Sequence, residues 1–161
     1  MIAFIFPGQG SQKIGMGRAL ADAFPVCRRT FEDADAALGE PLSRTIFEGS
    51  EDQLTLTENA QPAILAVSIA AERLVASRGL GPSLVAGHSL VQQVSAPVRW
   101  EAVVARLASE GVITYVEVGP GTVLTALVRK IHRDATVRSF GSPDDLAAVE
   151  DAAARLKGSR S

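Results

Sequence analysis

The sequence has little of what several specialised protein classes require. It contains a single cysteine, Cys27, so no disulfide framework and no thiolate metal site can form within one chain. Positive and negative charges nearly cancel, with 16 Lys and Arg against 18 Asp and Glu and a net charge of −2. This balance leaves no basic surface for nucleic acid and none for an anionic membrane. We therefore expect no metal, no nucleic-acid partner and no membrane association.

Long apolar runs are missing as well. The most apolar later segment, residues 63–71, is far shorter than a membrane span. The apolar start at residues 2–6 lacks the basic region and the cleavage site of a signal peptide. These features predict a soluble, cytoplasmic protein. With 161 residues, the chain is long enough to bury a continuous core, so we expect residues 1–161 to form a single α/β domain.

The dominant pattern is an alternation of short apolar segments with helical ones. Four segments are typical of buried strands: residues 2–6, 84–86, 112–118 and 135–140. Helical spacing predicts helices over residues 14–23, 26–38, 41–47, 59–78, 98–110 and 123–133, and a last helix from Ser142 to Leu156. This alternation predicts an open, doubly wound sheet of four parallel strands, with right-handed crossovers and helices on both faces.

Three of the four strands end in glycine-rich turns. Residues 7–12, 87–90 and 119–121 follow the first three strands, and parallel strands bring such turns to one edge of the sheet. Glycines on both sides of Gln9 allow main-chain amides to point into a pocket, although composition alone also fits a flexible turn. The glycine spacing matches neither a dinucleotide fingerprint nor a phosphate-binding loop, which argues against nucleotide binding.

The turn at Gly87-His88-Ser89 is the candidate centre of the chemistry. A sharp turn directly after a strand would lift the Ser89 hydroxyl above the sheet and leave the amide of Leu90 facing a developing oxyanion. The full pattern of such a turn is Gly-x-Ser-x-Gly, and Val91 stands in the last position. Read alone, this tripeptide is more often an ordinary exit from a strand.

Taken together, five segments resemble one enzyme family. They are Pro-Gly-Gln-Gly-Ser-Gln at 7–12, TENAQPA at 57–63, Gly-His-Ser-Leu at 87–90, Pro-Val-Arg-Trp at 97–100 and Glu-Val-Gly-Pro-Gly at 117–121. Their residues and their order resemble the malonyl-CoA:acyl carrier protein transacylases of fatty acid and polyketide synthesis. The resemblance implies an acyltransferase that uses malonyl-CoA and acyl carrier protein and needs no cofactor.

The resemblance also implies roles for four residues. Ser89 would be the nucleophile that carries the malonyl group as an ester. The amides of Gln9 and Leu90 would form the oxyanion hole, and Gln93 would be the glutamine that orients the catalytic histidine.

The family pattern breaks after Leu90. Members of the family continue with Gly-Glu and a long helix, a helix bearing an arginine for the malonyl carboxylate, a ferredoxin-like subdomain, and a Pro-Ser-His motif that carries the general base. None of these follows here, so we place an excision junction near residues 90–92. Neither histidine replaces the base. His88 is next to Ser89 at a tight turn, where neighbouring side chains point apart. His132 lies near the end of a helix that starts at the site, so it is remote from the serine. Arg99 and Arg129 are expected on solvated helix faces.

Without a base and an arginine, we expect malonyl transfer to be severely impaired. Two alternatives remain open. The chain could be a catalytically dead or minimised scaffold that still docks acyl carrier protein, or a weak esterase that uses water as the acceptor. Apolar residues near the junction also predict a homodimer through the surface that the missing segment would cover.

Overall fold

The computed structural model of the protein describes residues 1–87 and 99–158. Its four strands, β1 (Ile2–Phe6), β2 (Leu84–Gly87), β3 (Thr114–Val118) and β4 (Thr136–Phe140), are all parallel and lie in the order β2-β1-β3-β4. The predicted α/β fold with a four-stranded parallel sheet is confirmed. β3 begins at Thr114, two residues later than its sequence pattern suggested.

Most predicted helices are present. The described helices are α1 (Arg18–Ala23), α2 (Pro25–Leu38), α3 (Leu42–Glu48), α4 (Glu51–Thr55), α5 (Thr57–Ser77), α6 (Trp100–Ser109), α7 (Val123–Ile131), the 3-10 turn η2 (Pro143–Asp145) and α8 (Leu146–Gly158). α8 extends two residues beyond the predicted end at Leu156.

The predicted helix over residues 14–23 is wrong in its first turn, because α1 begins only at Arg18. Gly15 and Gly17 have φ angles of 80° and 74°, which lie in the left-handed region that an α-helix cannot contain. A Cβ on Gly17 would also lie 2.8 Å from a ring carbon of Phe31 on α2. The two glycines therefore form a tight turn that lets α1 approach α2, and helical periodicity alone does not reveal this packing.

The sheet is buried on both faces, each against its own helix layer. Phe4 and Val116 belong to a core shared with α1, α2, α3, α5 and α8, whereas Ala3, Ile5 and Tyr115 belong to a core shared with α6 and α7. Neighbouring residues of one strand thus face opposite cores, which explains why the strand segments are apolar without alternation. Burial on both faces is the arrangement expected for a parallel sheet with crossover helices.

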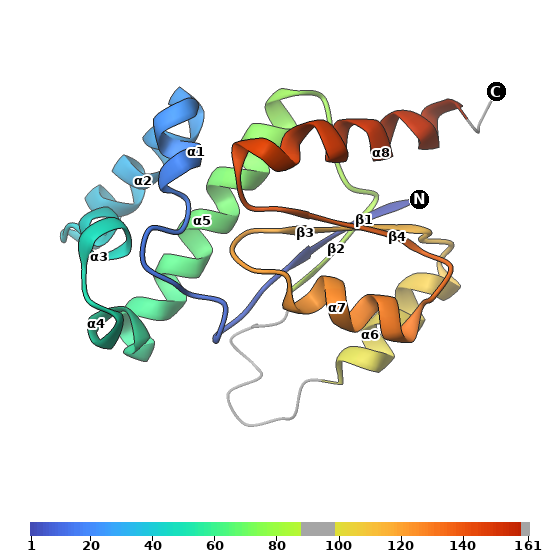
Figure 1. Ribbon diagram of the computed structural model, residues 1–161, viewed down its shortest axis with the longest axis horizontal. Coiled ribbons are helices and arrows are strands. Elements are labelled where there is room, and N and C mark those ends of the chain that lie inside the picture. Colours follow the sequence, from blue (N-terminus) through green and yellow to red (C-terminus); the bar gives the residue numbers. More distant parts are fainter. Residues whose placement is uncertain (88–98, 159–161) are drawn as a thin grey trace.

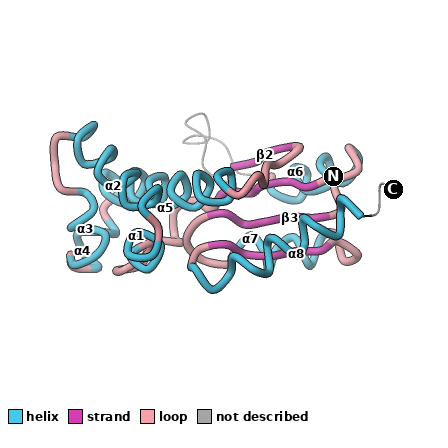
Figure 2. The backbone as a smooth tube through the Cα atoms, turned by 90° about the horizontal axis from the view of Figure 1, so that it is seen from above, coloured by secondary structure: helices cyan, strands magenta, loops and turns pink. Residues whose placement is uncertain are grey.

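The helices are unequally distributed around the sheet. Figures 1 and 2 show α1 to α4 gathered at one end of the molecule, beyond the edge at which the strands end, with the N-terminus at the other end. α5 links this helical end to the sheet, because its buried side chains contact both α2 and the sheet layer. Among the described helices, none is long and apolar enough to cross a membrane.

The packing of α2 against α5 encloses the single cysteine. Cys27 is fully buried, and its thiol donates a hydrogen bond to the Ala70 carbonyl oxygen of α5 at 3.3 Å. Burial raises the pKa of the Cys27 thiol to about 11. The core thiol predicted from the sequence is confirmed. The apolar face of α2 ends before Leu38, which is 47% exposed.

Candidate active site

The carboxyl ends of β1, β2 and β3 lie side by side at one edge of the sheet. In the strand register, Phe6 pairs with Gly87, and Ile5 pairs with Glu117. The loops that follow β1 and β3 therefore begin at the same edge, as the glycine-rich turns predicted. The third turn, with His88, Ser89 and Leu90, lies outside the described residues, and so does Gln93. The predicted roles of these residues remain predictions.

The loop after β3 packs closely against its neighbours. Gly119 has a φ of 130°, and a Cβ at this position would lie against Ser68 Oγ and 3.1 Å from Pro7 Cγ. On the other side, a Cβ on Gly141 would lie 2.7 Å from the Gly119 carbonyl oxygen. Gly119 is thus enclosed by α5, by the loop after β1 and by the turn after β4. Only a residue without a side chain fits this position.

A buried carboxylate on β3 also holds this loop in place. Glu117 on β3 is fully buried, and its two carboxylate oxygens accept hydrogen bonds from the main-chain amides of Leu124 at 3.1 Å and Thr125 at 2.6 Å. These amides lie in the first turn of α7, where they have no partner within the helix and where the helix dipole favours a negative charge. Glu117 therefore ties β3 to α7 across the Gly-Pro-Gly turn.

This structural role of Glu117 was not predicted, although the residue belongs to a motif noted in the sequence. The available signal was a charged residue within an apolar, strand-like segment directly before Gly119-Pro120-Gly121. A buried charge needs hydrogen-bond partners, and the nearest unpaired amides are those that open the following helix.

Gln9 lies in the loop after β1, at the edge of the sheet and over the start of α5. Its side-chain amide donates to Thr57 Oγ1, its side-chain carbonyl oxygen accepts from Gln61 Nε2, and both contacts measure 3.4 Å. The next amide in the loop, that of Gly10, donates to Gln12 Oε1 at 2.7 Å. No described residue accepts a hydrogen bond from the main-chain amide of Gln9. This amide is the one that the family resemblance assigned to an oxyanion hole.

His132, the one histidine among the described residues, lies far from this edge. It follows the last residue of α7, and its Nδ1 is 3.2 Å from the hydroxyl of Tyr115, the second residue of β3. The contact is at the end of the sheet where β3 begins, opposite to the edge at which β1 ends and the Gln9 loop starts. Burial raises the pKa of the Tyr115 hydroxyl. His132 is therefore placed to bond Tyr115 and not to accept a proton at the candidate site.

The two arginines discussed above are exposed, as predicted. Arg129 donates to the Val137 carbonyl oxygen at 3.5 Å, on the outer side of α7. Arg99 precedes α6 and borders a groove of about 670 Å³ between α6 and α7. Among the described residues, no group of three or more histidine, cysteine or acidic side chains is placed to hold a metal ion.

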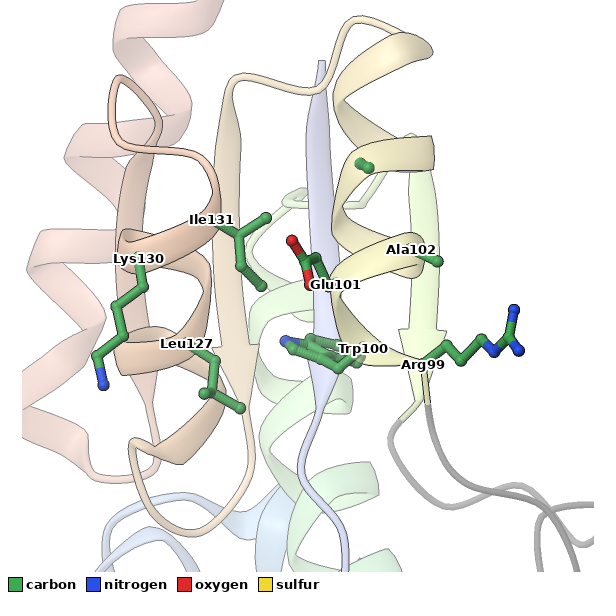
Figure 3. A pocket seen from close by; sticks show the side chains of 8 residues that line it. Arg99, Trp100, Glu101, Ala102, Leu127, Lys130 and Ile131 are labelled. Carbon is green, nitrogen blue, oxygen red and sulfur yellow. The ribbon is translucent and has the colours of Figure 1, made fainter.

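The α6–α7 groove combines an apolar floor with charged flanks. Its apolar lining consists of Trp100, Ala102, Ala105, Leu127 and Ile131. Figure 3 shows Trp100 and Glu101 between the two helices, and Arg99 and Lys130 on opposite flanks. Two cations thus flank an apolar strip, and one carboxylate lies between the helices, a composition that suits an amphipathic partner.

A comparison with protein families matches residues 3–91 to the family described as "Acyl transferase domain", which is more than half of the chain. Among curated proteins, the malonyl CoA-acyl carrier protein transacylase of Bacillus subtilis (strain 168) is 53% identical over 89 residues, which cover 55% of this chain and 28% of the relative. The enzyme of the same name from Escherichia coli (strain K12) is 43% identical over 89 residues, 55% of this chain and 29% of the relative.

One match extends further along the chain. The malonyl CoA-acyl carrier protein transacylase of Salmonella typhimurium is 32% identical over 151 residues, which cover 93% of this chain and 44% of that protein. A match of this length includes sequence on both sides of the predicted junction. The chain nevertheless spans only between 28% and 44% of the length of these three curated relatives.

Solved structures agree with the fold. The acyl-carrier-protein-S-malonyltransferase from Bartonella henselae superposes with a TM-score of 0.89 at 23% identity, covering 95% of this chain and 99% of that one. A malonyl-transacylase in complex with a type II polyketide synthase acyl-carrier protein superposes with a TM-score of 0.87 at 20% identity, covering 93% of this chain and 99% of that one. At identities of 23% and 20%, the structural likeness establishes the fold and nothing about the chemistry.

Proposed function

This chain belongs to the acyl transferase domain family, and from that premise we propose that it is a shortened malonyl-CoA:acyl carrier protein acyltransferase of fatty acid or polyketide synthesis. Ser89 would attack the thioester carbonyl carbon of malonyl-CoA, the Oγ proton would pass to a base, and coenzyme A would leave as the thiol. The thiol of acyl carrier protein would then attack the ester and return the proton to Ser89. The main-chain amides of Gln9 and Leu90 would stabilise both tetrahedral oxyanions.

One observation supports this proposal above the others. Gln9 is held by Thr57 and Gln61 at the edge where β1 and β2 end side by side, with Phe6 paired to Gly87. Ser89 follows Gly87 by two residues in the sequence. An amide with no described acceptor and a candidate nucleophile thus belong to two neighbouring strand ends, which is the arrangement that oxyanion stabilisation requires.

We further propose that the transfer step is severely impaired. A serine hydroxyl without a general base is a weak nucleophile, and the loss of one triad member typically slows catalysis by about four to six orders of magnitude. His132 bonds Tyr115 at the far end of the sheet. Arg99 and Arg129 are exposed and border other surfaces. We also propose that a segment of the family sequence is missing near residues 90–92 and that the protein is cytoplasmic.

Intact-mass spectrometry of the purified chain after incubation with malonyl-CoA tests the nucleophile. We expect slow growth of one species that is heavier by a single malonyl group, and its absence in the Ser89→Ala variant. An adduct that persists in Ser89→Ala would place the nucleophile elsewhere, and no adduct at any time would remove the enzymatic function. Transfer to acyl carrier protein at the rate of a full-length transacylase would contradict the impairment.

A second candidate is a scaffold that docks acyl carrier protein without catalysis. It is favoured by the α6–α7 groove, whose apolar floor and flanking Arg99 and Lys130 suit an amphipathic helix with acidic side chains. We expect the double variant Arg99→Glu with Lys130→Glu to weaken acyl carrier protein binding about tenfold or more. The double variant Arg29→Glu with Arg44→Glu, on the exposed faces of α2 and α3, is the matched control. Equal losses in both variants, or no binding by the unaltered chain, would remove this candidate.

The two remaining sequence-based alternatives receive less support. A weak esterase would hydrolyse the acyl-serine ester with water, and unchanged ester hydrolysis in Ser89→Ala would exclude it. Neither the described residues nor the relatives support the homodimer expected from the sequence. The proposal is therefore made for a single chain.

A further inference from the structure

A second hollow lies on the face of the sheet that α5 covers, between α5 and the carboxyl ends of β1 and β2. We call it the α5 groove. It has a volume of about 450 Å³, and its lining includes Phe6, Ile64, Leu65, Ser68, Ile69 and Glu72. This volume falls within the range of small-molecule sites, which are mostly apolar with a few polar groups at fixed positions.

The apolar part of the α5 groove is open to solvent. Leu65 is 59% exposed and Ile69 is 36% exposed, whereas their neighbours Ile64 and Ser68 are buried. Leu65 and Ile69 are four residues apart on α5, so they form one continuous apolar strip along the helix. Exposed apolar surface that borders a hollow commonly marks a ligand or interaction site.

The floor of the α5 groove holds a hydroxyl that lacks a partner. Ser68 is 4% exposed, and its Oγ has no hydrogen-bond partner among the described residues. The hydroxyl lies against Gly119, where any side chain would displace it. The Oγ atom is itself shielded from solvent, so it is packed inside the fold and is not exposed in the hollow. Ser68 therefore closes the floor of the groove without offering a hydrogen-bond donor to a ligand.

The charge of the α5 groove selects against anions. Glu72 is the one charged residue in its described lining, and no described cation pairs with it. The adjacent Arg73 is engaged by Asp33 at 2.9 Å. A carboxylate on the ligand would thus meet a like charge with no cation to offset it. A neutral ligand meets no such penalty.

The position of the α5 groove connects it to the candidate site. Its lining includes Pro7 and Gly87, the residues at which the turns after β1 and β2 begin. We propose that the α5 groove binds the neutral, unbranched acyl chain of a thioester, which leaves the thioester carbonyl oxygen to the proposed oxyanion hole at Gln9 and Leu90. The inference rests on the proposed acyl-transfer function, and it predicts a preference that is opposite to malonyl, because a neutral chain binds better than one that ends in a carboxylate.

Two probes of equal chain length test the charge preference. S-hexanoyl-N-acetylcysteamine is neutral, and S-adipoyl-N-acetylcysteamine adds a terminal carboxylate to a chain of the same length. Titration of the full chain carrying Ser89→Ala, followed by amide NMR shifts on α5, separates binding from turnover. We expect the hexanoyl probe to bind about tenfold more tightly near neutral pH. Equal affinities, or tighter binding of the adipoyl probe, would overturn the inference.

Variants of the lining test the location. Leu65→Glu, at an exposed position that leaves the core intact, should abolish hexanoyl binding. Glu72→Gln should raise the affinity for the adipoyl probe and leave that for the hexanoyl probe unchanged. Leu38→Gln, on an exposed apolar residue outside the groove, is the control and should change neither. Hexanoyl binding that survives Leu65→Glu would place the probe elsewhere.

The outcomes distinguish this inference from the function on which it rests. A malonyl adduct on Ser89 without hexanoyl binding would retain the acyltransferase and remove the α5 groove as an acyl site. If hexanoyl binding changes in the variants as predicted but no adduct forms, the α5 groove is supported as an acyl site and the acyltransferase function is contradicted.

Discussion

The two described loops at the edge of the sheet are held in different ways. The loop after β3 is held from within, by the buried Glu117 carboxylate and by the close packing of Gly119. The loop after β1 begins with the buried Pro7 and Gly8, but its tip is held at the surface, by two 3.4 Å contacts between Gln9 and the side chains of Thr57 and Gln61. The buried interactions form a rigid frame, and the exposed ones leave the Gln9 loop adaptable at the edge where chemistry is proposed.

Removal of the Glu117 carboxylate is expected to have the largest effect. In Glu117→Ala the amides of Leu124 and Thr125 lose their acceptors in a buried site, which should lower the free energy of unfolding by about 3 kcal/mol. Urea unfolding measures this change. Glu110→Ala, which removes an exposed partner of Arg106, should cost less than about 0.5 kcal/mol. Similar losses for both variants would show that the loop after β3 is not held from within.

A side chain on Gly119 should have the next largest effect. Gly119→Ala combines a left-handed φ of 130° with contact against Ser68 Oγ and Pro7, and should cost about 2 kcal/mol of unfolding free energy. Gly121→Ala is the comparison, because its φ is 89° but a Cβ there makes only an ordinary 3.4 Å contact with Ser11. We expect a smaller cost, about 1 kcal/mol.

A double variant separates the two causes at Gly119. Combining Ser68→Ala with Gly119→Ala removes the hydroxyl contact and leaves the backbone strain unchanged. The double variant should therefore be more stable than the sum of the two single changes predicts. Strict additivity in urea unfolding would mean that Ser68 does not press against this loop.

Loss of an anchor of the β1 loop should barely change stability. Gln61→Ala removes one exposed, long contact to Gln9 and should lower the unfolding free energy by less than about 0.5 kcal/mol. Formation of the proposed malonyl adduct should slow about three- to tenfold, because the Gln9 amide is less well positioned. Gln53→Ala on α4 is the control. A stability loss above about 1 kcal/mol in Gln61→Ala would mean that the two loops are equally rigid.

The smallest effect on stability is expected from ionisation of the Cys27 thiol. Cys27 lies on α2, in the helix layer that also contains Thr57 and Gln61. Its pKa is raised from 9.0 to about 11 by burial, so the folded state favours the neutral thiol. The stability that follows from this shift is complete below pH 9 and is lost as the pH rises from about 9 to 11.

Alkylation of the folded chain at pH 8 measures the protection of Cys27. It should be negligible, and it should become rapid in urea. Rapid labelling of the folded chain would show that the packing of α2 against α5 opens locally around Cys27.

Much of this fold follows from local patterns. The four strands and the long helix α5 are visible in the sequence because apolar runs and helical periodicity report burial directly. The error at α1 arose because Gly15 and Gly17 adopt left-handed φ angles within a helical pattern, and because Gly17 packs against Phe31, a contact that the local pattern does not reveal. Of the four predicted site residues, Gln9 lies at the expected edge, and the other three lie outside the described residues.

The sequence by itself determined the type and order of the elements and the glycine-rich turns after three strands, since short-range periodicity and turn chemistry depend only on neighbouring residues. Only the tertiary structure decided that β1 lies between β2 and β3, that the Glu117 carboxylate caps α7, and that the Ser68 hydroxyl meets Gly119 beneath an apolar groove. These arrangements join residues far apart in the chain. They depend on the packing of whole layers, which no local pattern encodes.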